Sequence, residues 1–154
     1  MAEPYSSSGS ALYISATTPA TLDATGYAAA TYLPVGNLIS LGDELGRVYS
    51  GVDVDFLSAR QTQTIKGQFT EGKITATMAR NPTDAGQALI MTALNSDALY
   101  TFKVTHGDGT TTPTIQYWRG LVMSYKTTGL SANNVTGAEV GITTNTPIIE
   151  VAAT

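Results

Sequence analysis

The sequence predicts a mainly β fold that includes one short helix. Three observations support this: apolar and polar residues alternate over most of the chain, one segment alone has helical spacing, and uncharged polar residues replace charged ones. Only 13% of the residues are charged, which is about half the usual share in globular proteins. The polar surface therefore comes from Thr, Ser, Asn, Gln and Gly, a composition that suits exposed strands and a surface covered by copies of the same chain.

Length and charge limit the organisation of the chain and its partners. A chain of 154 residues is expected to form one domain, residues 1–154, around a core that needs no cross-links. The formal net charge is −4, whereas tight binding of nucleic acid requires an excess of Lys and Arg. The absence of cysteine excludes disulfides and thiolate metal sites, and it fits a reducing compartment.

The N-terminal segment, residues 1–10, is small and polar and is expected to form a mobile arm. It lacks the basic start and apolar run of a secretory signal. No window approaches the roughly 18 apolar residues that span a bilayer. We therefore expect a chain made in the cytosol, with no membrane association.

The first half of the chain shows strands separated by loops. Apolar and polar residues alternate, as half-buried strands require, over residues 12–16 and 52–56, and residues 38–41 are a further candidate for a short strand. Residues 17–36 are rich in Thr, Ala and Gly and contain Pro19 and Pro34, which predicts a loop. Residues 42–46 are expected to form a turn or an open loop.

The threonine-rich stretch Gln61 to Ala79 predicts a β-hairpin. Ile65 and Phe69 are expected on one face of its first strand, opposite the polar residues. Glu71 and Gly72 are the predicted turn, after which the second strand returns with alternate apolar residues facing inward.

Residues 85–95, AGQALIMTALN, form the only segment with helical spacing. Pro82 biases Asn81 away from the helical conformation, so the preceding strand must end there. Thr83 or Asp84 is placed to cap the first turn, where a carboxylate also complements the helix dipole. The helix is too short to be stable alone and needs a sheet beneath it. The stripe expected to face this sheet consists of Ala85, Ala88, Leu89 and Ala93.

Alternation also predicts the remaining strands, with a Gly-Asp-Gly turn over residues 106–109 between the first two of them. These strands are expected at residues 100–104, 115–126, 135–143 and 148–151.

Three features invite a chemical interpretation, and each has a simpler one. His106 lies in the glycine-rich turn, and no nucleophile motif accompanies it. Asp53 and Asp55 share one face of a strand, where they form either a solvated surface, an acidic surface between subunits or an acid–base pair. Tyr117 and Trp118 must face opposite sides of a strand, so one is expected in the core and the other at an interface. With no zinc-ligand spacing either, we expect no metal, no cofactor and no enzymatic activity.

Several motifs follow one another in a recognisable order over residues 64–151. They are the threonine-rich strand 74–78, the Asn-Pro-Thr-Asp start of the helix at 81–84, the strand 99–104, the Gly-Asp-Gly turn, and the segment 118–124. In this order they resemble the major tail tube proteins of long, non-contractile-tailed bacteriophages, the lambda-like tail protein group. The resemblance covers somewhat more than half of the chain.

The resemblance implies a β-sandwich or barrel-like tail-tube domain with one flanking helix. Six copies would form a ring in which inner strands make a shared barrel, and rings would stack into the hollow tail tube of a virion. The tube would assemble in the host cytoplasm around a tape-measure protein, together with tail initiator and terminator proteins. It would then conduct phage DNA into the host, and an acidic or neutral lumen would let the DNA pass without specific binding.

The same picture assigns roles to particular residues. The polar face expected to line the inner barrel consists of Thr62, Thr64, Lys66, Gln68, Glu71, Lys73, Thr75 and Thr77. Residues 41–56 are the candidate inter-ring loop, with the charged residues Asp43, Glu44, Arg47, Asp53 and Asp55. Packing in the core or at an interface is expected for Phe69, Phe102, Tyr117 and Trp118. The C-terminal tail, residues 147–154, and the N-terminal arm are expected to become ordered on assembly.

Two other functions remain open at this point. A secretion-system or contractile-tail tube protein would have a similar fold, and sequence separates it poorly from the first interpretation. A carbohydrate-binding β-module would share the threonine-rich composition and the exposed aromatic residues.

Overall fold

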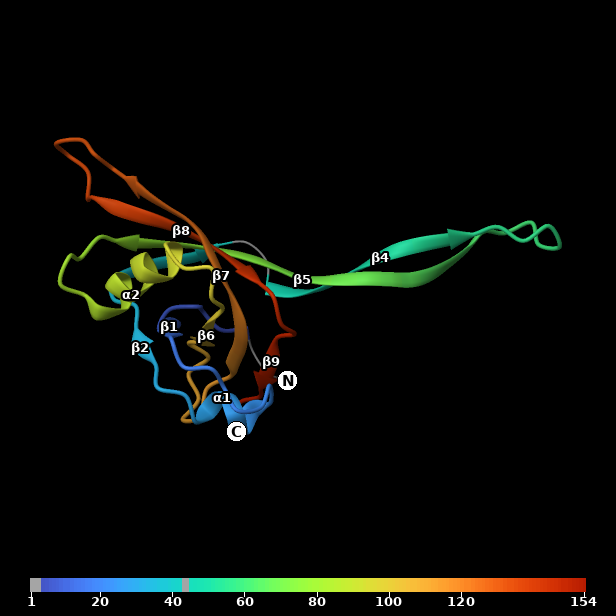
Figure 1. The fold of residues 1–154 in the computed structure, drawn as a ribbon, viewed down its shortest axis with the longest axis horizontal. Helices are drawn as coiled ribbons and strands as arrows, with labels where there is room; N and C mark the ends of the chain where they lie inside the picture. The colour runs from blue at the N-terminus through green and yellow to red at the C-terminus, as the bar shows by residue number, and fades with distance from the viewer. Residues whose placement is uncertain (1–3, 43–44) are drawn as a thin grey trace.

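The computed structural model describes residues 4–42 and 45–154, which form one antiparallel sheet and two helices (Figure 1). The elements are β1 (Ala11–Ser15), α1 (Ala24–Ala28), β2 (Leu33–Pro34), β3 (Leu38–Gly42), β4 (Leu45–Val54), β5 (Gln63–Ala79), α2 (Ala85–Leu94), β6 (Tyr100–Thr105), β7 (Ile115–Thr128), β8 (Gly137–Thr144) and β9 (Ile149–Val151). The mainly β fold and the helix after Asp84 are confirmed. The expectation of a single helix is wrong, because α1 forms within the predicted loop 17–36, where Asp23 caps it.

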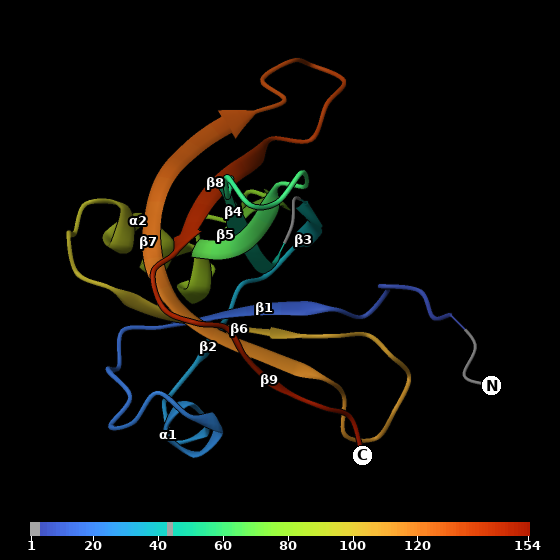
Figure 2. The same ribbon diagram turned by 90° about the vertical axis from the view of Figure 1, so that its right-hand side faces the viewer.

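The sheet bends into two layers because one strand, β7, belongs to both (Figure 2). Its first half pairs with β6 and β9, and its second half pairs with β8. The strand order is β2-β1-β6-β7-β8-β5-β3. Gly120 lies where β7 passes from one layer to the other, and a Cβ atom there would collide with the carbonyl oxygen of Thr143. The change of partner therefore requires glycine at this position.

The core lies between the two layers and under α2. Trp118 and Phe102 are fully buried in it, with their rings stacked at a centroid distance of 5.7 Å. Tyr117 faces the opposite side of β7, where Tyr27 of α1 stacks on it at 5.5 Å. The prediction that one of the two adjacent aromatics packs in the core is confirmed. The other is covered within its own chain by α1, an element the sequence prediction lacked.

The helix α2 packs on β7, β1 and β2. Asp84 caps it by accepting a hydrogen bond from the backbone N–H of Gln87 at 2.9 Å, as predicted. Thr83 does not cap, because its own N–H and hydroxyl both donate to the side chain of Asn81. The predicted stripe is wrong for Ala85 and Ala88, which are exposed. The buried face consists of Gly86, Gln87, Ile90 and Ala93.

The helix is rotated in this way because its buried glutamine joins three backbone segments. The side-chain amide of Gln87 donates to the carbonyl oxygens of Gly36 and Ala79, each at 3.0 Å. Its oxygen accepts from the backbone N–H of Asn81 at 2.9 Å. These bonds connect the start of α2 to the ends of β5 and of the segment before β3.

β5 is a single strand of 17 residues, so the hairpin predicted with a turn at Glu71 and Gly72 is wrong. Gly72 adopts a positive φ of 86°, and the hydroxyl of Thr144 donates to its carbonyl oxygen at 2.7 Å. The strand therefore bends at this glycine and continues without reversing. At the other end of the chain, β9 pairs with β7 within the subunit, so this part of the C-terminal tail does not wait for assembly to become ordered.

We expect Gln87→Leu to lower the free energy of unfolding by about 2–4 kcal/mol, because it leaves three backbone groups without a partner. Urea unfolding followed by circular dichroism measures this change. Thr92→Ala, on the exposed face of the same helix, is the matched control and should change stability by less than about 0.5 kcal/mol. Equal effects of the two substitutions would contradict the anchoring role of Gln87.

Candidate assembly surfaces

One layer of the sheet has a polar face on the side away from the core. This layer consists of β3, β5, β8 and the second half of β7. Along β5, Ile74, Ala76 and Met78 are buried, whereas the residues between them point to the opposite face. Of the predicted inner-barrel residues, three lie on this face: Lys73, Thr75 and Thr77. One row across all four strands contains Ser40, Thr77, Glu139 and Lys126.

Both edges of this polar-faced layer are open. Within the described ranges, β3 pairs with β5 alone, and residues 121–128 of β7 pair with β8 alone. Because all four strands alternate in direction, the two edge strands run in opposite directions. The edge of one copy can therefore pair in antiparallel fashion with the other edge of a second copy.

A long hairpin projects from the end of this layer, away from the body of the subunit (Figure 1). It consists of β4 and the first part of β5, joined by a tip at residues 55–62. Within the candidate inter-ring loop 41–56, residues 45–54 therefore form a paired strand, which begins inside the turn or open loop expected over 42–46. Asp43 and Glu44 lie outside the described residues. The predicted inner-barrel residues Thr62, Thr64, Lys66 and Gln68 lie on this hairpin and not on the body of the layer.

One face of the hairpin is bound together by polar and aromatic contacts. The hydroxyls of Thr64 and Thr62 donate to the carboxylates of Asp53 and Asp55 at 2.7 and 2.6 Å. Nearer the body, the rings of Tyr49 and Phe69 lie 5.5 Å apart, with the ammonium group of Lys66 over Tyr49. A bulge between these groups places Phe69 and Lys66 on the same face, so the expectation that Ile65 and Phe69 share a face is wrong.

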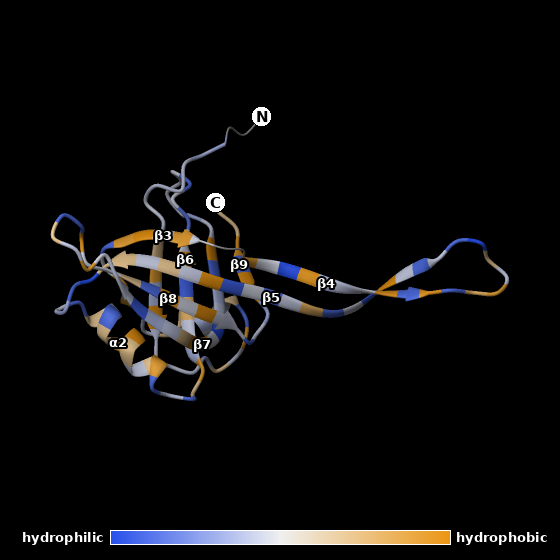
Figure 3. Ribbon diagram, turned by 90° about the horizontal axis from the view of Figure 1, so that it is seen from above, coloured by the Kyte–Doolittle hydropathy of each residue, from blue (hydrophilic) through white to orange (hydrophobic). Residues whose placement is uncertain are grey.

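Apolar and polar positions alternate along the two strands of the hairpin (Figure 3). The opposite face of the hairpin and its tip carry exposed apolar side chains. They are Val48, Val52, Phe56, Leu57 and Ile65. Leu57 is fully exposed. An isolated two-stranded hairpin is only marginally stable in water, and exposed apolar side chains of this size mark surfaces that another molecule covers. This apolar face has no partner among the described residues of its own chain.

The root of the hairpin is held by a partly buried ion pair. Two nitrogens of the Arg47 guanidinium contact Oε1 of Glu71 at 2.6 and 2.8 Å, and the guanidinium also lies over the ring of Phe69. Glu71, which is predicted to face the lumen of an assembled ring, is only 7% exposed in the single chain. Its carboxylate instead joins β5 to β4 where the hairpin leaves the body.

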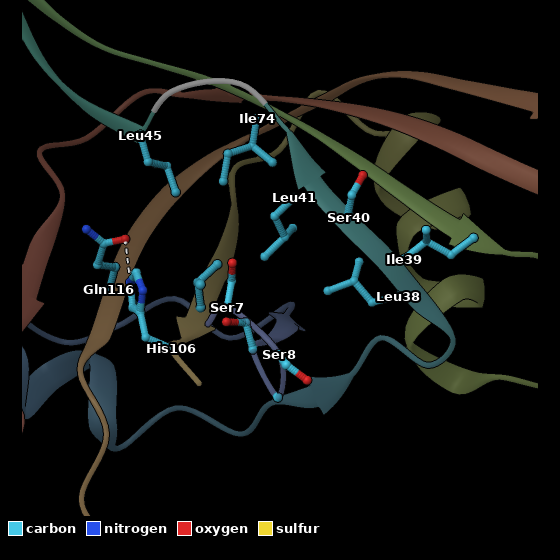
Figure 4. A pocket seen from close by; sticks show the side chains of 13 residues that line it. Ser7, Ser8, Leu38, Ile39, Ser40, Leu41, Leu45, Ile74, His106 and Gln116 are labelled. Atoms are coloured by element: carbon cyan, nitrogen blue, oxygen red, sulfur yellow. Dashed lines mark hydrogen bonds between the residues drawn. The ribbon is translucent and has the colours of Figure 1, made fainter. Parts of the chain in front are cut away.

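The turn after β6 shows no catalytic arrangement among the described residues. A ring nitrogen of His106 lies 3.1 Å from Oε1 of Gln116 beside a half-apolar cavity of about 770 Å³ that the N-terminal segment and β3 also line (Figure 4). Asp108 accepts hydrogen bonds from the backbone N–H of Thr114 and the hydroxyl of Thr110, which together lower the pKa of its carboxyl to about 2. Asp108 therefore holds the turn and does not orient His106.

Over residues 4–42 and 45–154, no group of three or more acidic, histidine or cysteine side chains is placed to hold a metal ion. Neither helix in these ranges is long and apolar enough to cross a membrane.

No protein-family model and no curated protein matches the sequence. The fold does match solved structures along almost the entire chain. A chain in the six-fold symmetrised cryo-EM structure of the anti-feeding prophage baseplate has a TM-score of 0.71 and 10% identity, with 99% of this chain and 98% of that chain covered. A chain in the sheath/tube terminator of PVC, an extracellular contractile injection system, has a TM-score of 0.70 and 12% identity, with 98% and 99% covered.

A third similar chain comes from the PVC sheath–tube complex in its extended state. Its TM-score is 0.67 and its identity 12%, with 97% of this chain and 93% of that chain covered. The protein therefore has the fold found in tube, terminator and baseplate assemblies of phage-like injection systems.

We expect Arg47→Ala to lower the free energy of unfolding, because it leaves the Glu71 carboxylate without its partner, although water screens part of the lost attraction. Chemical unfolding gives the total loss, and amide exchange along β4 shows whether it is concentrated at the hairpin root. Arg60→Ala, which removes an arginine at the tip of the same hairpin, should have little effect. A loss as large in that control would contradict the role of the pair.

The lowered pKa of Asp108 predicts a specific acid dependence. The folded state favours the carboxylate, so its stabilisation is complete above the ordinary pKa of 3.8 and is lost as the pH falls through about 2. An NMR titration of the Asp108 carboxyl should show the shifted midpoint, and Asp108→Asn should flatten the loss of stability in this window. A midpoint near 3.8 would contradict the role of Asp108 in holding the turn.

Proposed function

We propose that this protein is the structural subunit of a hollow tail tube, in which six copies form a ring and the rings stack. The observation that carries the proposal is the four-stranded layer with one polar face and two open edges of opposite direction. Joining these edges between copies would close the layers into a shared barrel and remove every open edge from it. The polar face would then line the channel, while the core and α2 would lie outside it.

The projecting hairpin supports the stacking of rings. It extends well beyond the body of the subunit, and its apolar face and tip need a surface to cover them (Figure 1). The ion pair at its root and the contacts along its polar face keep the two strands together in the free subunit. In this proposal the hairpin reaches the neighbouring ring, the role predicted for residues 41–56.

The charges on the polar face suit a channel for a polyanion that must not bind tightly. Lys126 is the cross-strand neighbour of Glu139, and Lys73 lies four residues along β5 from that row, so these positive charges form no cluster on the face. The acidic pair Asp53 and Asp55 lies on the hairpin. In this proposal the tube conducts phage DNA into the host without specific binding, and the subunit acts without catalysis.

The proposed partners follow from the same role. The tube would form around a tape-measure protein, beginning on an initiator and ending at a terminator, in the host cytoplasm, and would remain in the tail of the virion. The similarity to a chain in a sheath/tube terminator structure supports this setting.

A contractile-tail or secretion-system tube is the second candidate, favoured by a specific observation. Two of the similar chains come from an extracellular contractile injection system, whereas the sequence motifs resemble non-contractile tails. The two candidates differ in whether a sheath surrounds the tube. Electron microscopy of intact particles that contain this chain distinguishes them, since only a contractile particle has a sheath around its tube.

Negative-stain microscopy of the purified chain at increasing concentration tests the proposed function. We expect hexameric rings and hollow tubes. A strict monomer that binds defined glycans on an array would overturn the proposal in favour of a carbohydrate-binding module.

We further expect the double substitution Phe56→Ser and Leu57→Ser to abolish tubes while single rings remain, because the hairpin tip would lose the apolar contacts proposed to join rings. Negative-stain images and size-exclusion chromatography measure the outcome. Leu22→Ser, which replaces an exposed leucine outside the hairpin, is the control and should leave tubes intact. Tubes of normal length from the double variant would contradict the stacking role.

A further inference from the structure

Each open edge of the polar-faced layer contains a β-bulge. The pairing of β3 with β5 shifts between Leu38 and Ser40, which leaves Ile39 without a cross-strand partner. The pairing of β7 with β8 shifts between Val122 and Ser124, which leaves Met123 in the same position. The two side chains are 65% and 62% exposed. Neither belongs to the core of its own subunit.

These residues are unusual choices for the edge of a sheet. Edge strands that avoid pairing typically carry charged residues or proline, and a bulge normally adds to this protection. Here both bulges instead expose a large apolar side chain beside the polar face. These two edge strands are therefore suited to pairing with one specific partner strand, and they lack the features that keep an edge strand unpaired.

We propose that Ile39 of one copy packs against Met123 of the next, where β3 of the first copy pairs with β7 of the second. This inference rests on the proposed ring and names the contact that sets the register between its subunits. If the two bulges face each other, the backbone hydrogen bonds between β3 of one copy and β7 of the next are interrupted at one point only. In any other register the two bulges interrupt these hydrogen bonds at two separate points. The contact also covers two apolar side chains that water would otherwise surround.

The proposed register also agrees with the geometry of a barrel. Positions along the layer can be compared by their register on β5. Ile39 lies opposite the peptide bond between Thr77 and Met78, and Met123 lies in the row between Ile74 and Thr75. Bringing the two together displaces each copy by about three residues along the strands relative to its neighbour, and a sheet can close into a barrel only with such a stagger. A join without stagger would separate Ile39 from Met123.

The cysteine-free sequence allows a direct test with Ile39→Cys and Met123→Cys. Within one copy the two positions lie on opposite edges of four strands, so they are separated by about 14 Å across the strands and by about three residues along them, which is beyond the reach of a disulfide. A disulfide between them must therefore join two copies. Both side chains are exposed, and thermal unfolding by circular dichroism verifies that the variants remain folded.

A mixture of the two single variants, oxidised at the concentration at which the protein assembles, should give covalent dimers on non-reducing gels. The chain that carries both substitutions should give a ladder ending at a closed ring. The control mixture combines Ile39→Cys with Leu130→Cys, an exposed apolar position in the loop between β7 and β8, and should give no dimer.

The possible outcomes separate this inference from the proposed function. Absence of the Ile39–Met123 product overturns the proposed register, whether or not rings form. Rings in negative stain without that product reject the register alone and leave the tube function standing. An equal yield from the Leu130 control also overturns the register, because the disulfide would then report random collisions.

Discussion

The bend of β7 is the constraint on which the rest of the structure depends. One strand of 14 residues pairs with β6 and β9 in its first half and with β8 in its second half. The two layers therefore meet along a continuous strand and enclose one core, with Trp118 at its centre. The bend is possible because Gly120 has no side chain at the point where the backbone of β8 comes closest.

The same bend separates the two surfaces proposed for assembly from the core. Because β6 leaves β7 at Gly120, the second half of β7 has no partner on its outer edge, and it becomes one open edge of the polar-faced layer. β3 forms the other edge at the far side of the same layer. In a single subunit the backbone groups on these two edges bond only to water, and pairing with another copy would protect both edges, which is the physical reason for proposing a ring.

The hairpin leaves a second surface of the subunit uncovered. Its strands β4 and β5 protect each other only on one face, where threonine hydroxyls, aspartates, aromatic rings and cations are in contact. The other face is apolar and exposed. The free subunit therefore has two uncovered surfaces, the open edges of the polar-faced layer and the apolar face of the hairpin. The ion pair between Arg47 and Glu71 joins these two incomplete regions, since it fastens the hairpin to the layer that would form the barrel.

The amino-acid sequence by itself determined most of the segments that become strands, though not β2 or the first part of β4, and it determined where α2 begins and how it is capped. These features depend on local alternation, on Pro82 and on the short carboxylate of Asp84, all of which act within a few residues. It also indicated the tail-tube type of fold that the solved structures share. Local pattern could not show which face of α2 is buried, because Gln87 is polar and is buried only where Gly36, Ala79 and Asn81 converge on it.

Only the tertiary structure decided how the strands are paired. β5 has a turn-like Glu71-Gly72 sequence in its middle, yet it continues because β4 and β8 offer partners on either side of that point and Thr144 binds the bent backbone. The same pairing buries Glu71, places Phe69 on the face of the hairpin opposite to Ile65, and leaves the two bulged edges open. Pairing between segments distant in the chain carries no local signal, so the surfaces proposed for assembly become visible only once the sheet is formed.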